Sequence, residues 1–242
     1  MGWILMSLLK TSFSSRARPS FLFYIISFMS SVSPTVRLWN ILCWNIRGLN
    51  GDDKWTPLRD KIDESNAAVV CLQETKMMHF DNSTTRKFAP KRFDRFISVP
   101  SNGASGGLLI LWNSAVFAGS LIMQETFGVV VKFTSTMSSE SWTLVNVYGP
   151  CQEPRRTDFI NWLHNLDIPD DENWILMGDF NFYRYVDSRN RQGANLNDIA
   201  IFNELISYLG LIELPIKGRA YTWSNMQSDP LLVQLDWFFY IC

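Results

Sequence analysis

An apolar run that ends in Gly-Asp-Phe-Asn is the feature that most constrains how this 242-residue chain can fold. Residues 174–177 (WILM) are uniformly apolar, which predicts a strand buried on both faces. The GDFN segment follows at once, so the strand delivers the carboxylate of Asp179 and the amide of Asn181 to one edge of a sheet. The carboxylate can orient or deprotonate a water, and the amide can donate to a phosphoryl oxygen. A segment of this kind can equally be a turn without chemistry, and the rest of the sequence decides between the two.

Other predicted strands also end in polar residues. Asn45 closes one apolar run, Glu74 follows a second and Tyr148 closes a third. Ligand sites in layered α/β folds commonly gather at strand ends, so we expect these residues to meet Asp179 and Asn181 at one edge.

Strands outnumber helices along the chain. The predicted strands cover residues 38–45, 67–72, 108–112, 129–133, 142–148, 174–177, 221–223 and 233–240. Apolar residues at helical spacing predict one helix over residues 55–62, one that begins at Thr157 and one that ends before Gly210. Several strands follow one another directly. This order predicts an α/β fold in which two sheets pack face to face with helices outside.

The charge of the chain is unevenly distributed. An apolar fraction of 47%, with ten Trp and seventeen Phe, predicts a substantial core. No acidic residue precedes Asp52, whereas residues 52–242 carry 17 Lys and Arg against 23 Asp and Glu. Such a domain lacks the basic surface of a tight non-specific nucleic-acid binder. If it acts on nucleic acid, a metal ion or a local patch must offset the repulsion.

The four cysteines predict neither a disulfide framework nor a zinc site. No two of them form a C-x-x-C pair. Cys43 and Cys71 lie inside apolar strand-like runs, so we expect both to be reduced core residues.

Residues 1–37 differ from the rest of the chain, and we expect an N-terminal extension followed by one domain over residues 38–242. The apolar run 21–29 follows three basic residues and is shorter than the roughly 20 residues that span a bilayer. Its Arg and Ser content and its lack of acidic residues fit an organellar transit peptide better than a signal peptide. The alternative, which we favour, is an unstructured extension.

Five motifs stand in order along the domain: CWNIRGL (43–49), LQETK (72–76), VNVYGP (145–150), GDFN (178–181) and LDWFF (235–239). In this order and spacing they resemble the endonuclease/exonuclease/phosphatase superfamily, which includes DNase I-like and apurinic-site endonucleases. The segments GASGGL (103–108), LPIKGR (214–219) and TWSN (222–225) are similar, more narrowly, to the endonuclease domain of plant LINE-type retrotransposons. The resemblance covers roughly residues 38–242 and implies a four-layer α/β-sandwich of two mixed sheets flanked by helices.

The resemblance also implies a role for each polar strand-end residue. Glu74 matches the principal ligand of Mg²⁺ or Mn²⁺, a hard cation that prefers carboxylate oxygen, and Asn45 matches the asparagine that helps to position Glu74 and the metal. Asp179 matches the aspartate that orients or activates the attacking water. Asn181 and Tyr148 match groups that contact the scissile phosphate and stabilise its developing charge.

Two further residues belong to the implied site. Asp236 matches a carboxylate that orients a catalytic histidine, and its burial in an apolar strand would be costly without a partner. Arg47 stands where apurinic-site members carry an acidic residue; the LINE-like branch shares the arginine, which makes it a candidate phosphate contact. The structural alternatives are that Glu74 is a solvated turn residue, that Tyr148 only closes its strand and that Asn45 caps a loop.

The sequence departs from the family at its C-terminal end. In the family, the last strand is followed by a Ser-Asp-His motif, whereas this sequence ends at Cys242, and neither His79 nor His164 matches that position. We therefore expect the domain to lack its last strand and to present an exposed edge in its second sheet. Loss of an acid–base group typically costs about 10²–10⁴-fold in rate.

The implied activity is Mg²⁺-dependent in-line hydrolysis of a DNA phosphodiester. The resulting 3′-hydroxyl would prime reverse transcription in a mobile element. We expect a DNA-nicking endonuclease of retroelement origin that is a monomer with no obligate protein partner, in the nucleus or the cytoplasm. One alternative is a catalytically impaired remnant of this domain. Another is a phosphatase of the same superfamily, which the acidic charge favours and the TWSN and LDWFF segments argue against.

Overall fold

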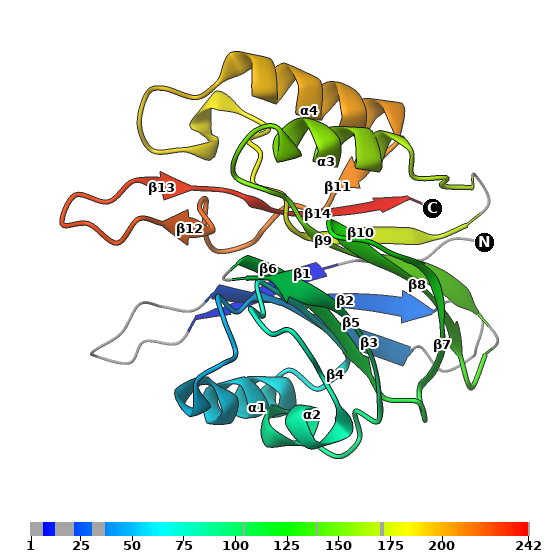
Figure 1. Ribbon diagram of the computed structural model, residues 1–242. Helices are drawn as coiled ribbons and strands as arrows, with labels where there is room; N and C mark the ends of the chain where they lie inside the picture. The colour runs from blue at the N-terminus through cyan, green and yellow to red at the C-terminus, as the bar shows by residue number, and fades with distance from the viewer. Residues whose placement is uncertain are drawn as a thin grey trace.

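Four layers of secondary structure are stacked in the protein, two sheets in the middle and a pair of helices on each outer face (Figure 1). The structure is a computed structural model that describes residues 7–12, 22–30, 37–103, 105–138, 140–169 and 172–241. Each of the two main sheets has six strands with mixed pairing. The α/β-sandwich predicted from the sequence is therefore confirmed. No helix in the described ranges is long and apolar enough to cross a membrane.

The first sheet has the strand order β1-β2-β3-β4-β6-β5. Its strands are β1 (Ser7–Ser12), β2 (Leu22–Ser30), β3 (Arg37–Asn45), β4 (Ala67–Gln73), β5 (Arg95–Asn102) and β6 (Ser105–Trp112). Only β3 and β4 run parallel, and a short 3₁₀ helix η1 (Asp52–Lys54) and helix α1 (Trp55–Glu64) connect them. Helix α2 (Asn82–Phe88) packs beside α1 on the outer face. Because β4 is covered on both faces, all of its residues are buried, as the uniformly apolar run predicted.

The second sheet has the strand order β11-β14-β10-β9-β8-β7. Its strands are β7 (Phe117–Gln124), β8 (Gly128–Ser135), β9 (Ser141–Tyr148), β10 (Trp174–Asp179), β11 (Ile212–Glu213) and β14 (Asp236–Ile241). Here only β9 and β10 run parallel, joined through helix α3 (Arg155–His164). Helices α3 and α4 (Leu196–Tyr208) cover the outer face. The 3₁₀ helix η2 (Val186–Ser188) and the hairpin of β12 (Trp223–Ser224) and β13 (Leu232–Val233) complete the described elements.

Apolar side chains fill the three spaces between the four layers. Ile41, Val69, Leu144 and Met177 belong to the cluster between the sheets, and further clusters lie beneath each helix pair. Cys43 and Cys71 are buried and free, as predicted.

Strand β2 corrects one prediction about the N-terminal segment. It pairs antiparallel with β3 from Tyr24↔Cys43 to Ser30↔Arg37, and residues 23–27 are buried. The described parts of residues 1–37 are thus strands of the first sheet and not an unstructured extension. An apolar run with two buried faces is stabilised by the backbone partners that β3 offers. Residues 1–6, 13–21 and 31–36 lie outside the described residues, and a targeting role stays a prediction.

Strand β14 corrects a second prediction. We expected an exposed edge in the second sheet, yet β14 pairs along its length with β10 and, at Phe239 and Tyr240, with the two-residue strand β11 on its other side. Short strands such as β11 leave little unpaired backbone at a sheet edge.

Candidate active site

The polar residues predicted at strand ends meet at one end of the two sheets. Asn45 is the last residue of β3, and Glu74 follows β4 directly. Tyr148 and Asp179 are the last residues of β9 and β10 and lie opposite each other in the parallel pair. Since both parallel pairs point the same way, their carboxyl ends form one polar edge.

Asn45 joins the two sheets at this edge. Its side-chain Nδ2 donates to Glu74 Oε1 at 3.1 Å and to Asp179 Oδ2 at 2.7 Å. The backbone N–H of Arg47 donates to Asn45 Oδ1 at 3.3 Å. One amide therefore fixes the spacing between two carboxylates that come from different sheets.

The Glu74 carboxylate has two polar neighbours, the hydroxyl of Tyr148 and the ammonium group of Lys76. Tyr148 lies near enough to Glu74 for the charge of the carboxylate to act on its hydroxyl, and Lys76 Nζ lies 3.7 Å from Glu74 Oε2. Burial raises the pKa of Tyr148 above its usual value, and the negative charges of Glu74 and Asp179 raise it further. The tyrosine consequently keeps its proton and acts as a hydrogen-bond donor.

Asp179 and Asp236 lie directly opposite each other in the antiparallel pair of β10 and β14, and both are buried. Burial raises the pKa of Asp179 well above its usual value, with Asp236 and Glu74 adding to the effect. Burial likewise raises the pKa of Asp236 to about 7, against the opposing effects of a Thr222 hydrogen bond and the Arg47 charge. The pair therefore holds a proton near neutral pH and can exchange it with a water.

Asn181 supports Asp179 from the following loop. Its backbone N–H donates to Asp179 Oδ1 at 3.1 Å, and its side-chain Nδ2 donates to Gly149 O at 2.7 Å. Arg156 Nη1 in turn donates to the Asn181 carbonyl at 2.7 Å. One side-chain donor of Asn181 is thus engaged within the loop, and its contact with a phosphate stays a prediction.

The backbone at this edge adopts an unusual conformation. Among the described residues, four of the six non-glycine positions with positive φ are Arg47, Glu74, Lys76 and Asn181. Such positions cost about 1–3 kcal/mol each and persist where neighbouring structure fixes them. Here the N–H of Gly48 donates to the Glu74 carbonyl at 2.6 Å, and the N–H of Lys76 donates to the Gly106 carbonyl at 3.0 Å.

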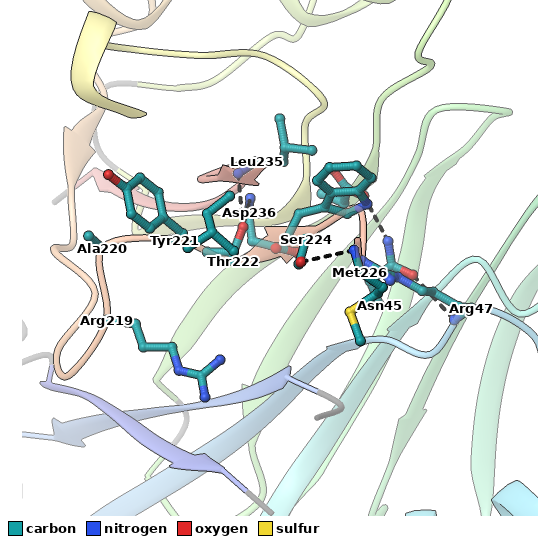
Figure 2. A pocket seen from close by; sticks show the side chains of 13 residues that line it. Asn45, Arg47, Arg219, Ala220, Tyr221, Thr222, Ser224, Met226, Leu235 and Asp236 are labelled. Carbon is teal, nitrogen blue, oxygen red and sulfur yellow. Dashed lines mark hydrogen bonds between the residues drawn. The ribbon is translucent and has the colours of Figure 1, made fainter. Parts of the chain in front are cut away.

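A cavity of about 370 Å³ opens beside the two aspartates. Figure 2 shows Asn45, Arg47 and Asp236 at its wall, with Arg219 and Thr222 from the loop before β12. A second hollow of about 480 Å³ lies at Tyr148, bounded by Gly106, Gly107, Phe127, Cys151 and Arg155 among others. Exposed arginines at both hollows provide local positive charge in an acidic domain.

Residues 42–240 match the Endonuclease/Exonuclease/phosphatase family. The chain belongs to this family. Its members are nucleases and phosphatases, hydrolases that typically depend on a divalent metal ion. No curated protein is similar enough in sequence to match the chain.

Solved structures share the fold. The AP endonuclease LMAP from Leishmania major is 16% identical with a TM-score of 0.65, over 84% of this chain and 79% of that one. The endonuclease domain of TRAS1, a telomere-specific non-LTR retrotransposon, is 16% identical with a TM-score of 0.63, over 83% of each chain. The APE2 catalytic domain from Xenopus laevis is 17% identical with a TM-score of 0.60, over 83% and 82%. At these identities the likeness shows the fold alone.

The oxygen donors at the edge fit the divalent cation that the family uses. The described residues contain no group of three or more His, Cys, Asp or Glu that could enclose a metal ion. Mg²⁺ does not need such a cage, because it usually keeps several waters and binds one or two carboxylates together with substrate phosphate oxygens. Glu74 supplies the carboxylate, and Asn45 holds one of its oxygens in place.

The sequence analysis did not single out three residues of this site. Lys76, Arg219 and Thr222 lie inside segments that were used only for the family resemblance, LQETK, LPIKGR and TWSN. Lys76 stands two residues after Glu74, the predicted metal ligand, and this spacing was the one signal that could have been interpreted. Nothing in the sequence places Arg219 or Thr222 beside Asp236.

Proposed function

We propose that the chain is a Mg²⁺-dependent phosphodiester hydrolase that nicks DNA, of retroelement origin. The single observation that carries this proposal is the pair of hydrogen bonds from Asn45 to Glu74 and Asp179. These bonds hold the Glu74 carboxylate, which is suited to a metal ion, beside the Asp179 carboxylate, which is suited to a water. The two residues come from different sheets.

Each residue of the edge has a chemical task in this proposal. Glu74, held by Asn45, would bind Mg²⁺ or Mn²⁺, which when bound stabilises charge on a phosphoryl oxygen. In its ionised form Asp179 accepts a hydrogen bond from the attacking water and takes the proton, and its raised pKa makes that form a stronger base. The Tyr148 hydroxyl and an Asn181 donor stabilise the phosphate, and Arg47 is a cation next to it.

DNA is the proposed substrate. The chain shares its fold with a retrotransposon endonuclease domain and with an AP endonuclease, and its plant LINE-like segments point the same way. Arg47 and Arg219 at the first cavity and Arg155 at the second supply the local patch that the acidic domain requires. We propose a monomer with no obligate protein partner, located in the nucleus or the cytoplasm.

One observation favours a catalytically impaired domain as the second candidate. His79 and His164 are both exposed and line neither cavity. His164 stacks on Tyr208, with ring centroids 4.2 Å apart, on the outer helices. The residues that form the site therefore include no histidine to stabilise the leaving group.

Nicking of supercoiled plasmid by the purified chain tests the proposal, with Mg²⁺ or with EDTA. Glu74→Ala and Asp179→Ala should each reduce the nicking rate by about 10²–10⁴-fold. Glu204→Ala is the matched control, because Glu204 is exposed on α4. A folded wild-type chain that neither nicks DNA nor hydrolyses inositol phosphate would be the impaired domain. Hydrolysis of inositol phosphate that depends on Glu74, without nicking, would identify a phosphatase.

A further inference from the structure

Arg156, in the first turn of α3, reaches the loop that follows β10. Its Nη1 donates to the Asn181 carbonyl at 2.7 Å, and its Nη2 donates to Asp198 Oδ2, in the first turn of α4, at 2.7 Å. The guanidinium group also lies over the Phe182 ring, 3.8 Å from its centroid. Helices α3 and α4 lie side by side (Figure 1), and this one planar group connects both of them to the loop that carries Asn181.

These contacts suit a guanidinium group. Its donors lie in one rigid plane, so it can bond two acceptors at once while it stacks on an aromatic face. The bond to the Asp198 carboxylate is charge-assisted and is therefore the stronger of the two. Asp198 thus fixes one arm of Arg156, and the other arm is directed to the Asn181 carbonyl. An ammonium group at this position would bond to the carboxylate and leave the carbonyl without this donor.

Asn181 needs such a contact, because its backbone has a positive φ of 55°. A non-glycine residue in this conformation is strained and keeps it only where neighbouring contacts fix it. Here the Arg156 bond fixes the carbonyl, and the 2.7 Å bond to Gly149 O fixes the side chain. The backbone N–H of Asn181 then donates to Asp179 Oδ1 at 3.1 Å. Release of the carbonyl would therefore loosen the donor that orients the Asp179 carboxylate.

We propose that Arg156 and Asp198 are positioning residues that hold Asn181 in the conformation in which its N–H orients the Asp179 carboxylate. In the part of the chain that the structure describes, neither of the two forms a hydrogen bond with Asp179 or Glu74, so their effect passes through Asn181. The outer helices thereby contribute to the geometry of the catalytic edge. The effect on rate rests on the proposed function, whereas the effect on the Asn181 amide does not.

Hydrogen exchange of the Asn181 backbone amide tests this role without requiring activity. The full chain is labelled with ¹⁵N-asparagine, and the Asn181 signal is assigned with Asn181→Asp. Arg156→Lys keeps the positive charge and removes the planar fork, which should speed exchange at Asn181 about tenfold. Asn146 is buried in β9, so exchange of its backbone amide reports the opening of the whole sheet.

Arg184→Lys is the matched control. Arg184 forms an ion pair with Glu213, and its side chain is 14% exposed, as is that of Arg156. The two lysine variants should speed exchange at Asn146 by similar factors, because each loses a guanidinium fork of equal burial. Only Arg156→Lys should speed exchange at Asn181.

A second variant keeps the test valid if Arg156→Lys does not fold. Asp198→Asn keeps the shape of the side chain and weakens the bond that fixes Arg156, so it should speed exchange at Asn181 about threefold. In the nicking assay, Arg156→Lys should lower kcat about tenfold with KM unchanged, because the Asp179 carboxylate acts on the attacking water and does not bind the DNA. Arg184→Lys should leave kcat unchanged.

Three outcomes decide the matter. Unchanged exchange at Asn181 in the folded variants would overturn the role of Arg156 and Asp198. In a chain that nicks, an equal effect of Arg156→Lys and Arg184→Lys on kcat, or no effect of either, would overturn it as well. Faster exchange at Asn181 in a chain that never nicks would support the positioning role and refute the proposed function.

Discussion

Asn45 donates a 2.7 Å hydrogen bond to Asp179, a residue 134 positions later in the chain. The bond crosses from the first sheet to the second, and the same nitrogen also donates to Glu74. The relative position of the two carboxylates thus depends on one side-chain amide. Strand packing brings the sheets together, and this amide sets the local geometry.

Replacing the Asn45 amide tests how much the activity and the stability each depend on the hydrogen bonds that it donates. Asn45→Ala should reduce the nicking rate by about 10²-fold or more, because both carboxylates lose the donor that orients them. Asn45→Asp should lower activity further and also lower Tm, since it adds a third negative charge beside two others. Plasmid nicking and thermal unfolding measure the two effects. An Asn45→Ala variant with wild-type activity would show that the bridge is dispensable.

The raised pKa of Asp236 makes stability depend on pH. Between about pH 4 and pH 7 the folded protein keeps a proton that the unfolded chain has already released. The folded state binds more protons, so the free energy of unfolding falls as pH rises through this range and levels off above it. We expect Tm without metal to fall by about 5 °C or more between pH 5 and pH 8. Thermal scans at fixed ionic strength measure this change.

The control for this pH dependence is Asp236→Asn. The amide cannot ionise, so the variant should lose less Tm over the same range. If the Tm of Asp236→Asn falls with pH as steeply as that of the wild type, the pH dependence of stability arises from Asp179 or from other groups.

Lys76 should weaken metal binding at Glu74. Its ammonium group lies 3.7 Å from Glu74 Oε2 and is half-buried, so it competes with an incoming cation for the same carboxylate. Lys76→Met should lower the Mg²⁺ concentration that gives half-maximal nicking by about threefold, a modest effect because solvent screens the pair. Lys91→Met, at an exposed position, is the control. A higher Mg²⁺ requirement in Lys76→Met would mean that the lysine supports the metal site.

Burial explains which strands the sequence predicted. Strands β4 and β10 are covered on both faces, so their sequences are uniformly apolar and easily interpreted. Strand β7 was missed because it lies at a sheet edge, and only Phe117, at its start, is buried. Strand β2 was misinterpreted because a short apolar run behind basic residues has the same local pattern as a targeting segment.

The sequence predicted the site residues whose position depends on local structure, but not those whose position depends on contacts between distant segments. The polar strand-end residues were predicted, because their position depends only on where a strand stops. The participation of Thr222 and Arg219 depends on which distant segments pack together, and a single sequence does not encode that in any local pattern. The sequence also predicted that helix α3 begins at Thr157, and this prediction was wrong. The helix begins at Arg155, and both the N–H and the hydroxyl of Thr157 bond with the Glu153 carboxylate.

A buried amide pair beneath the site should contribute to stability only as a pair. Gln73 Nε2 in β4 donates to Asn146 Oδ1 in β9 at 2.5 Å, and Asn146 Nδ2 donates to the Leu72 and Leu109 carbonyls at 3.3 Å. Asn146→Leu alone leaves the buried Gln73 amide without this acceptor and should cost about 1–3 kcal/mol of unfolding free energy. Adding Gln73→Leu removes the unsatisfied group and should recover part of that loss. Urea denaturation of both single variants and the double variant gives the coupling energy. Additive losses would show that the two amides stabilise the sheets independently.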